Sequence, residues 1–360
     1  MTIVLFVLGL VLLIAGAEAL VRGASKLALS FGISPLVVGL TVVAFGTSSP
    51  ETAVAVQSAY VGEVDIALGN VVGSNIFNVL FVLGVSALIA PLVVHQQLIR
   101  QEVPIMIGVS LLLLALAYDG TIERWEGALF LAGLAAYTGF LLRQSRRETR
   151  AVREEYEHEF GEPEPPTGWD RGRPVQLLLI VVGVTMLVVG SNWLVDGAVA
   201  FAEYLGVSAL VIGLTIVAAG TSLPEVATSV LATLKGERDI AVGNVIGSST
   251  FNILCVLGAA SVAAPDGLDV APAVLNFDIW VMLAVAVACL PVFFTGNLVA
   301  RWEGGLFLAY YAAYTAYLLL FATGHDALGP FSLAMLVFVI PLTLVTLAVG
   351  AWREVRGAPR

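Results

Sequence analysis

The sequence contains one long segment twice, and this duplication limits the folds that the chain can adopt. Residues 32–91 align without a gap to residues 206–265, 174 positions later, and 34 of the 60 aligned residues are identical. The similarity extends further, because RWEGALFLAGLAAYTGFLL at 124–142 matches RWEGGLFLAYYAAYTAYLL at 301–319. Self-similarity of this kind indicates two copies of one structural unit.

Apolar runs of about 20 residues recur along the chain, and each is long enough to cross a hydrocarbon layer about 30 Å thick as a helix. Hydrophobic residues make up 59% of the chain and charged residues 12%, whereas soluble domains carry about a quarter charged residues. The composition predicts an all-α polytopic membrane protein. Eleven spans are expected, near 2–21, 33–60, 66–92, 103–118, 125–142, 175–195, 207–233, 240–264, 273–295, 302–322 and 331–351.

Five of these spans fall in each copy, and the eleventh has no counterpart in the first copy. Because five is odd, the second copy enters the membrane from the side opposite to the first, which makes the copies inverted repeats. We expect ten core helices and an extra C-terminal helix. The predicted boundaries are a first repeat at 1–142, a linker at 143–174, a second repeat at 175–322 and the extra helix and tail at 323–360.

Basic residues concentrate on one predicted side of the membrane. Arg22 and Lys26 follow the first span, and seven arginines lie in the linker at 143–174. Since loops rich in Lys and Arg stay in the cytoplasm, the linker and the C-terminus are expected there, with the N-terminus outside and the protein in the plasma membrane. The net charge of −10 comes from acidic loops, and we expect no nucleic-acid partner.

A glutamate lies inside an apolar segment in each copy. GTSSPE at 46–51 ends in Glu51, and GTSLPE at 220–225 ends in Glu225. An ionisable side chain at the centre of a membrane helix costs about 2.5 to 3.5 kcal/mol on insertion scales, so it needs a partner. The central spans contain no Lys or Arg, which argues against a salt bridge. The two glutamates are therefore expected to bind a cation or a proton.

A proline precedes each of these glutamates. Pro50 and Pro224 have no backbone N–H and clash with the preceding turn, so the helix is predicted to break there, with simple bending as the alternative. Inverted-repeat transporters place their ion sites at such broken helices. The break is expected to release backbone carbonyls as ligands at Ala44, Thr47, Ala218 and Thr221.

A polar strip with a spacing of four residues follows in each copy. It comprises Asn70, Ser74 and Asn78 in GNVVGSNIFN, and Asn244, Ser248 and Asn252 in GNVIGSSTFN. This spacing puts each trio on one helical face, where interhelical hydrogen bonding is the alternative role for the asparagines. Every predicted ligand is an oxygen atom, which suits Ca²⁺ or Na⁺, and the lack of nearby His or Cys argues against zinc, copper and iron.

These motifs resemble those of the calcium/cation antiporters, and specifically the prokaryotic sodium/calcium exchangers. The resemblance covers residues 1–322, and it is carried by GTSSPE and GNVVGSNIFN in the first copy and by GTSLPE and GNVIGSSTFN in the second. It implies ten core helices in two inverted halves. It also implies alternating access, produced by sliding of the first and sixth helices against the rest.

The resemblance implies a role for each matching residue. Glu51 and Glu225 would coordinate calcium, helped by the carbonyls of Thr47 and Thr221. The sodium sites around them would use Ala44, Ser48, Ser74, Ala218, Ser222 and Ser248, and the central site would include Asn78 and Asn252. Some archaeal and potassium-dependent members carry Asp where this chain has Asn252. That difference weakens a potassium-dependent interpretation and brings the pattern nearer to proton-coupled relatives.

The predicted function is a secondary antiporter that exchanges Ca²⁺ for Na⁺ by alternating access. A Ca²⁺/H⁺ antiporter on the same scaffold is the alternative, and a cation channel is less favoured because inverted repeats within one chain suit alternating access. An enzyme is not expected, since Ser48 and Ser222 have no intramembrane His or Lys as a base. We expect no cofactor besides the transported ions, and the sequence leaves the oligomeric state open.

Overall fold

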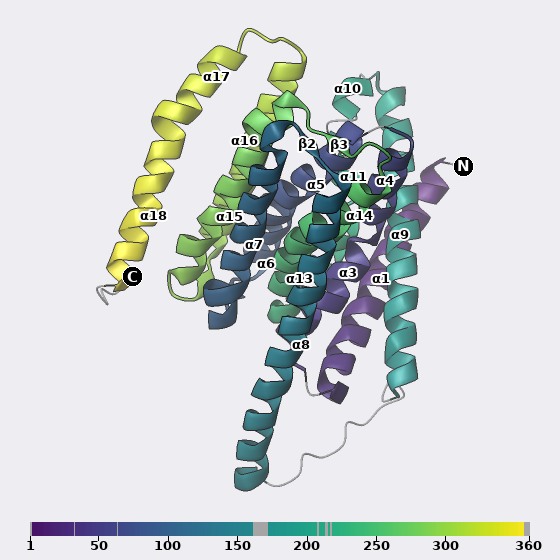
Figure 1. Cartoon of the computed structure of the whole chain (residues 1–360), viewed down its shortest axis with the longest axis vertical. Helices are drawn as coiled ribbons and strands as arrows, with labels where there is room; N and C mark the ends of the chain where they lie inside the picture. Colours follow the sequence, from purple (N-terminus) through teal and green to yellow (C-terminus); the bar gives the residue numbers. More distant parts are fainter. Residues whose placement is uncertain are drawn as a thin grey trace.

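Long helices make up almost the whole structure (Figure 1). The computed structural model describes residues 2–31, 33–62, 64–160, 172–206, 209–212, 215–216 and 218–355, without the side chains of 146–160 and some others. The first half contains α1 (Thr2–Phe31), α2 (Pro35–Val38), η1 (Gly39–Val43), α3 (Ala44–Thr47), α4 (Ser49–Tyr60), α5 (Val64–Phe77), η2 (Asn78–Leu83), α6 (Gly84–Ile89), η3 (Leu98–Glu102), α7 (Val103–Leu116), η4 (Ala117–Asp119) and α8 (Arg124–Phe160).

The second half repeats this order of helices. It contains α9 (Arg173–Tyr204), α10 (Ala209–Ile212), α11 (Ala218–Gly220), α12 (Leu223–Leu234), α13 (Arg238–Phe251), η6 (Asn252–Leu257), α14 (Gly258–Ala263), η7 (Val274–Asp278), α15 (Ile279–Phe294) and α16 (Arg301–Ala322). The chain ends with α17 (Leu328–Ala334), η8 (Met335–Val339) and α18 (Ile340–Val355), which lie along one side of the bundle (Figure 1).

The prediction of an all-α polytopic membrane protein is confirmed. Among the described residues, nine helices are long and apolar enough to cross a membrane, and the bent pair Pro35–Thr47 and Ser49–Tyr60 gives a tenth. The remaining expected span, 207–233, includes residues outside the described part, and α10, α11 and α12 are its described pieces. α8 continues as one helix to Phe160, so the predicted linker begins as a helix, and its residues 161–171 lie outside the described part.

The fourth span begins at Leu98, earlier than the predicted 103. Hydropathy placed its start too late because the first turn contains a charged residue, Glu102, which the structure nevertheless buries. Glu102 is fully buried and accepts hydrogen bonds from Tyr137 Oη at 2.7 Å and Gln97 Nε2 at 3.0 Å. In the second half, Tyr314 Oη donates to Asp278 Oδ1 at 2.8 Å in the same way. A carboxylate–tyrosine pair thus joins the fourth and fifth spans of each repeat.

Two equivalent helices, α1 and α9, pack antiparallel along their whole length. A Cβ atom added to Gly9 would lie 2.7 Å from the Gly190 carbonyl oxygen, and one added to Gly16 would lie 2.8 Å from that of Gly183. Only glycine permits this close backbone approach. Gly183 and Gly190 are the repeat counterparts of Gly9 and Gly16, since each pair is 174 positions apart. Corresponding helices therefore run in opposite directions, and the repeats are inverted.

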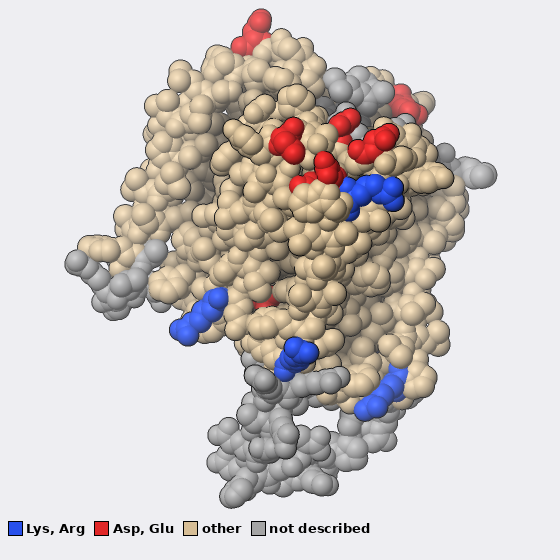
Figure 2. All heavy atoms as spheres, in the orientation of Figure 1, with Lys and Arg blue, Asp and Glu red and all other residues tan. Residues whose placement is uncertain are grey.

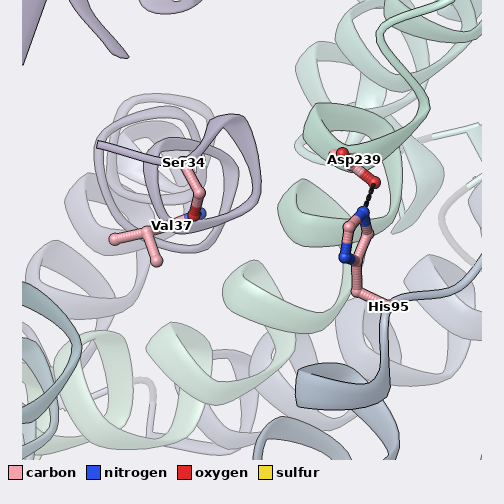
Figure 3. A network of polar contacts seen from close by, with 4 residues as sticks. All are labelled: Ser34, Val37, His95 and Asp239. Atoms are coloured by element: carbon pink, nitrogen blue, oxygen red, sulfur yellow. Dashed lines mark hydrogen bonds and ion pairs between the residues drawn. The ribbon is translucent and has the colours of Figure 1, made fainter. Parts of the chain in front are cut away.

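Short strands connect the two halves at both ends of the bundle. β1 (Leu92–Val93) pairs antiparallel with β4 (Leu298–Val299), and β2 (Thr121–Ile122) pairs antiparallel with β3 (Leu268–Asp269). Each pair joins the loop after the third span of one repeat to the loop before the fifth span of the other. Beside β1, His95 Nε2 lies 3.2 Å from Asp239 Oδ1 of α13, and nearby Ser34 caps α2 by accepting from the Val37 amide (Figure 3).

Charged side chains divide between the two ends of the bundle. Acidic side chains gather around β2 and β3, where one basic side chain accompanies them, and the other basic side chains in view lie toward the opposite end (Figure 2). Asp119 and Asp269 share the acidic end because β2 pairs with β3. The face in view is therefore electrostatically asymmetric along the helix axes, and an unequal distribution of Lys and Arg favours one orientation of a membrane protein.

We expect Gly16→Val to lower the free energy of unfolding by about 1–3 kcal/mol, because the added side chain forces α1 away from α9. Thermal unfolding in detergent measures the loss. Gly108→Val is the matched control, since Gly108 is an exposed helical glycine and no described atom lies within 4 Å of an added Cβ. Equal losses for both variants would contradict the close glycine-mediated packing of α1 against α9.

Candidate functional site

The helix that carries each glutamate is broken just before it. α3 ends at Thr47 and α4 starts at Ser49, with Ser48 outside helical geometry at φ −81° and ψ 9°, and the two parts bend by 46°. Ser222 has nearly the same geometry, φ −90° and ψ 9°, before α12. Each proline lies in the first turn of the new helix, where its missing N–H is not needed. The predicted breaks are confirmed.

The carbonyl of Ala44 is not released, and that prediction was wrong. Its oxygen accepts the Ser48 amide at 3.0 Å and lies 3.3 Å from Thr47 Oγ1, because α3 completes its last turn before the break. Pro50 instead deprives Gly46 of the amide four residues ahead of it. Ala218 begins α11, and its side chain lies outside the described part of the chain.

The two glutamates are fully buried and hydrogen-bonded across the repeats. Ser48 Oγ donates to Glu225 Oε1 at 3.3 Å, and Ser222 Oγ donates to Glu51 Oε1 at 3.2 Å. Within each repeat the serine precedes its glutamate by three residues. The four side chains therefore form two reciprocal hydrogen bonds, in which each carboxylate accepts from a serine hydroxyl of the other repeat.

The second oxygen of each glutamate has no hydrogen-bond partner in the described part of the chain. Glu51 Oε2 and Glu225 Oε2 are buried without a hydrogen bond from any described residue, and the same is true of Asn252 Oδ1 and both amide atoms of Asn78. Leaving one buried polar group unsatisfied costs about 1–3 kcal/mol, and more for a charged group. A bound cation would satisfy the oxygen atoms in this set.

The polar strips also pair across the repeats. Thr47 Oγ1 donates to Asn244 Oδ1 at 3.0 Å and lies 3.3 Å from Ser248 Oγ. The counterpart of the Thr47–Asn244 bond is that of Thr221 Oγ1 with Asn70 Oδ1 at 3.2 Å. Ser74 Oγ lies 3.1 Å from Ser222 Oγ, which follows Thr221 in the chain. The strip in each repeat thus faces the broken helix of the other.

The helices that carry the central asparagines also pack against the broken helix of the other repeat. Asn78 begins η2, which packs against α12, whereas Asn252 begins η6, which packs against α4. Asn252 Nδ2 donates to Asn75 Oδ1 at 3.0 Å, and Asn75 Nδ2 donates to the Ser249 carbonyl at 3.0 Å. Sequence reasoning missed Asn75, because it lies one position off the four-residue spacing that identified its neighbours.

Thr228 and Ser229 were also missed. Both are fully buried, and Ser229 Oγ accepts from Asn244 Nδ2 at 3.0 Å. They lie three and four residues after Glu225, which is the spacing of one helical face, and that spacing could have identified them. Among the described residues, no group of three or more His, Cys, Asp or Glu could hold a metal ion, and both cysteines are free.

Known proteins share both the sequence and the fold. The family model described as "Sodium/calcium exchanger protein" matches residues 1–143 and 175–320. The chain belongs to this family. The sodium/calcium exchanger MaX1 of Methanosarcina acetivorans is 33% identical over 339 residues, covering 86% of this chain and 96% of MaX1. CaxA of Alkalimonas amylolytica is 43% identical over 289 residues, covering 79% of this chain and 88% of CaxA.

A solved structure agrees over most of the chain. The sodium/calcium exchanger from Methanococcus jannaschii matches with a TM-score of 0.74 and 29% identity, covering 88% of this chain and 97% of that one. The predicted fold class and the resemblance to calcium/cation antiporters are thus confirmed. The protein is a multi-pass membrane transporter, a cation antiporter, and not an enzyme.

Ser48→Ala should lower the free energy of unfolding in cation-free buffer by about 1–3 kcal/mol, because it leaves both oxygens of the buried Glu225 without partners. The adjacent Ser49 is the matched control. Its hydroxyl donates to the Phe45 carbonyl at 2.9 Å at an exposed position, so Ser49→Ala should change stability by less than about 0.5 kcal/mol. Thermal unfolding with a chelator present compares the two, and equal effects would contradict the cross-repeat bond.

Proposed function

We propose that this protein exchanges Ca²⁺ for Na⁺ across the membrane by alternating access. The observation that carries the proposal is the pair of buried carboxylates, Glu51 and Glu225. Each has one oxygen bonded to the other repeat and one oxygen that no described residue contacts through a hydrogen bond. The names of its relatives, which include two sodium/calcium exchangers, support the same substrates.

The charge of the site supports overlapping occupancy by the two ions. Two carboxylates balance one Ca²⁺, whereas three Na⁺ at the same carboxylates would leave one positive charge in excess. Exchange in that ratio moves one net charge per cycle, worth about 2.3 kcal/mol for each 100 mV of membrane potential. The membrane potential would then contribute to calcium export together with the Na⁺ gradient.

We assign the ligands by role. Calcium takes six to eight oxygen ligands in proteins, roughly, and Glu51, Glu225, and the carbonyls of Thr47 and Thr221 would supply the first of them. The sodium positions would use hydroxyls that the structure places beside the glutamates, with carbonyl groups completing them. The proposed set is Ser48, Ser74, Ala218, Ser222 and Ser248, with Asn78 and Asn252 in the central position.

Unequal burial of equivalent positions supports alternating access. Val54, one turn after Glu51, is 37% exposed, whereas its counterpart Thr228, one turn after Glu225, is fully buried. α1 packs against α12, and Lys235 at the end of α12 pairs with Glu18 of α1. The helix after the glutamate is therefore covered at this position in the second repeat and open in the first. If the two repeats exchanged these environments, access to the site would switch from one side of the membrane to the other.

The charge asymmetry supports an orientation with the linker 143–174 and the C-terminus in the cytoplasm and the N-terminus outside. In the plasma membrane, where Na⁺ is higher outside, this exchange would expel calcium. A cysteine introduced at Thr167 in the linker should react with an impermeant maleimide in inverted vesicles and not in intact cells.

We expect Glu51→Gln and Glu225→Gln each to lower Ca²⁺ exchange at least 100-fold, since losing a charged ligand of about 3 kcal/mol corresponds to that factor. Uptake of ⁴⁵Ca²⁺ into reconstituted vesicles measures the rate. Glu203→Gln is the control, because Glu203 is exposed near the end of α9, and it should retain the wild-type rate. Normal exchange in either buried-site variant would overturn the site assignment.

The proton is the specific alternative to Na⁺ as the coupling ion. Asn78 and Asn252 in the central position are neutral, so Glu51 and Glu225 supply the two negative charges of the proposed site, and two protons could neutralise them in place of one Ca²⁺. Vesicles loaded with Na⁺ should take up ⁴⁵Ca²⁺ when diluted into Na⁺-free buffer, and a protonophore should not abolish that uptake. Uptake that ignores Na⁺ and collapses with the protonophore would instead establish Ca²⁺/H⁺ exchange.

A further inference from the structure

Thr228 carries a buried hydroxyl that is not bonded to its own helix. Its side chain is 0% exposed, and Oγ1 has no hydrogen-bond partner among the described residues. A buried threonine in a helix usually donates to the carbonyl four residues back. Thr233 in the same helix does so, with Oγ1 2.8 Å from the Ser229 carbonyl, and Thr52 in α4 does so at 2.8 Å from the Ser48 carbonyl.

Thr228 lies on the same face of α12 as Glu225. Residues three apart in a helix lie on one face, with Cβ atoms about 5–6 Å apart. Glu225 is the residue three positions earlier, and its Oε2 is likewise buried without a partner. α12 therefore carries, on one helical face, two buried oxygen atoms that have no partner among the described residues.

The first repeat has no equivalent of this hydroxyl. Val54 occupies the position of Thr228 and places methyl groups one turn after Glu51. Ala55 likewise stands where Ser229 does, and Ser229 bonds the polar strip through Asn244. The two glutamates, equivalent in the repeated motif, thus differ in the ligands available beside them.

We propose that Thr228 Oγ1 and Glu225 Oε2 form a subsite for one Na⁺ that belongs to the second repeat alone. One carboxylate and one neutral hydroxyl match a single positive charge, whereas Ca²⁺ takes both carboxylates. The subsite makes sodium binding asymmetric between the repeats. This inference rests on the proposed function, because it names a position for one of the exchanged ions.

Thr228→Val tests the subsite, since it removes the hydroxyl and keeps the shape. We expect the concentration of Na⁺ that half-activates ⁴⁵Ca²⁺ exchange to rise about 5- to 10-fold, the factor for one lost ligand of about 1 kcal/mol or slightly more. Calcium binding in Na⁺-free buffer should stay within twofold of wild type. Thr228→Ser keeps the hydroxyl and should restore the sodium dependence.

Thr233→Val is the matched control, because it removes an equally buried hydroxyl that is already bonded within α12. It should lower the thermal stability and leave the sodium dependence unchanged. Thr228→Val should instead raise the unfolding temperature in cation-free buffer, where wild type buries an unsatisfied group, and should reduce the further rise caused by added NaCl over an equal concentration of choline chloride.

An unchanged sodium dependence in Thr228→Val would overturn the subsite while leaving the exchange itself established. Equal weakening of Na⁺ and Ca²⁺ would also overturn it, because the hydroxyl would then serve both ions. If wild-type protein showed no Na⁺-dependent exchange, the proposed function would fail. The Na⁺-induced shift in unfolding temperature, compared between wild type and Thr228→Val, would still decide whether Thr228 binds Na⁺.

Discussion

Two carboxylates buried at the centre of the molecule need partners that neither repeat supplies by itself. Each glutamate bonds a serine of the opposite repeat, through Ser48 to Glu225 and Ser222 to Glu51. Removing the hydroxyl leaves a buried carboxylate without its hydrogen bond, which costs about 1–3 kcal/mol. The two halves therefore fold onto each other at this point, and the oxygens left without partners are where a cation adds to stability.

The rest of the architecture holds these four side chains in place. The proline in each motif starts a new helix, which puts the glutamate in the first turn of α4 or α12, where the helix dipole favours a negative charge. The glycines of α1 and α9 bring two backbones into contact, and short strand pairs join the loops of the halves at both ends. The proline breaks, the glycine contacts and the strand pairs all form without long polar side chains inside the membrane.

Inverted repeats do not have to be in identical surroundings at the same time. α1 packs against α12, and Thr228 of α12 is fully buried, while Val54 at the equivalent position of α4 is partly exposed. Sequence differences at these positions add to the structural asymmetry, because a hydroxyl in one repeat corresponds to methyl groups in the other. A transporter that uses one site from two sides can thereby bind its ions unequally on each side.

Much of the fold and the centre of the site followed from local sequence rules. Apolar length predicted the spans, the odd number of helices per copy predicted inversion, and proline before glutamate predicted the breaks that Ser48 and Ser222 show. Local rules failed where a neighbour decided the outcome. The Ala44 carbonyl kept its amide partner, and the fourth span extended past Glu102 because Tyr137 and Gln97 satisfy that carboxylate.

The sequence by itself determined that the chain crosses a membrane many times, that its two halves are inverted copies, and that each copy carries a glutamate inside an apolar segment. These properties depend on hydrophobic length and on symmetry, which are additive along a chain. Only the tertiary structure decided that each motif is completed by the opposite repeat, and that Thr228 keeps a free hydroxyl beside Glu225. The pairings across the repeats depend on distances between residues more than a hundred positions apart, and no local pattern encodes them. The spacing places Thr228 near Glu225, but whether its hydroxyl finds a partner depends on the packing around it.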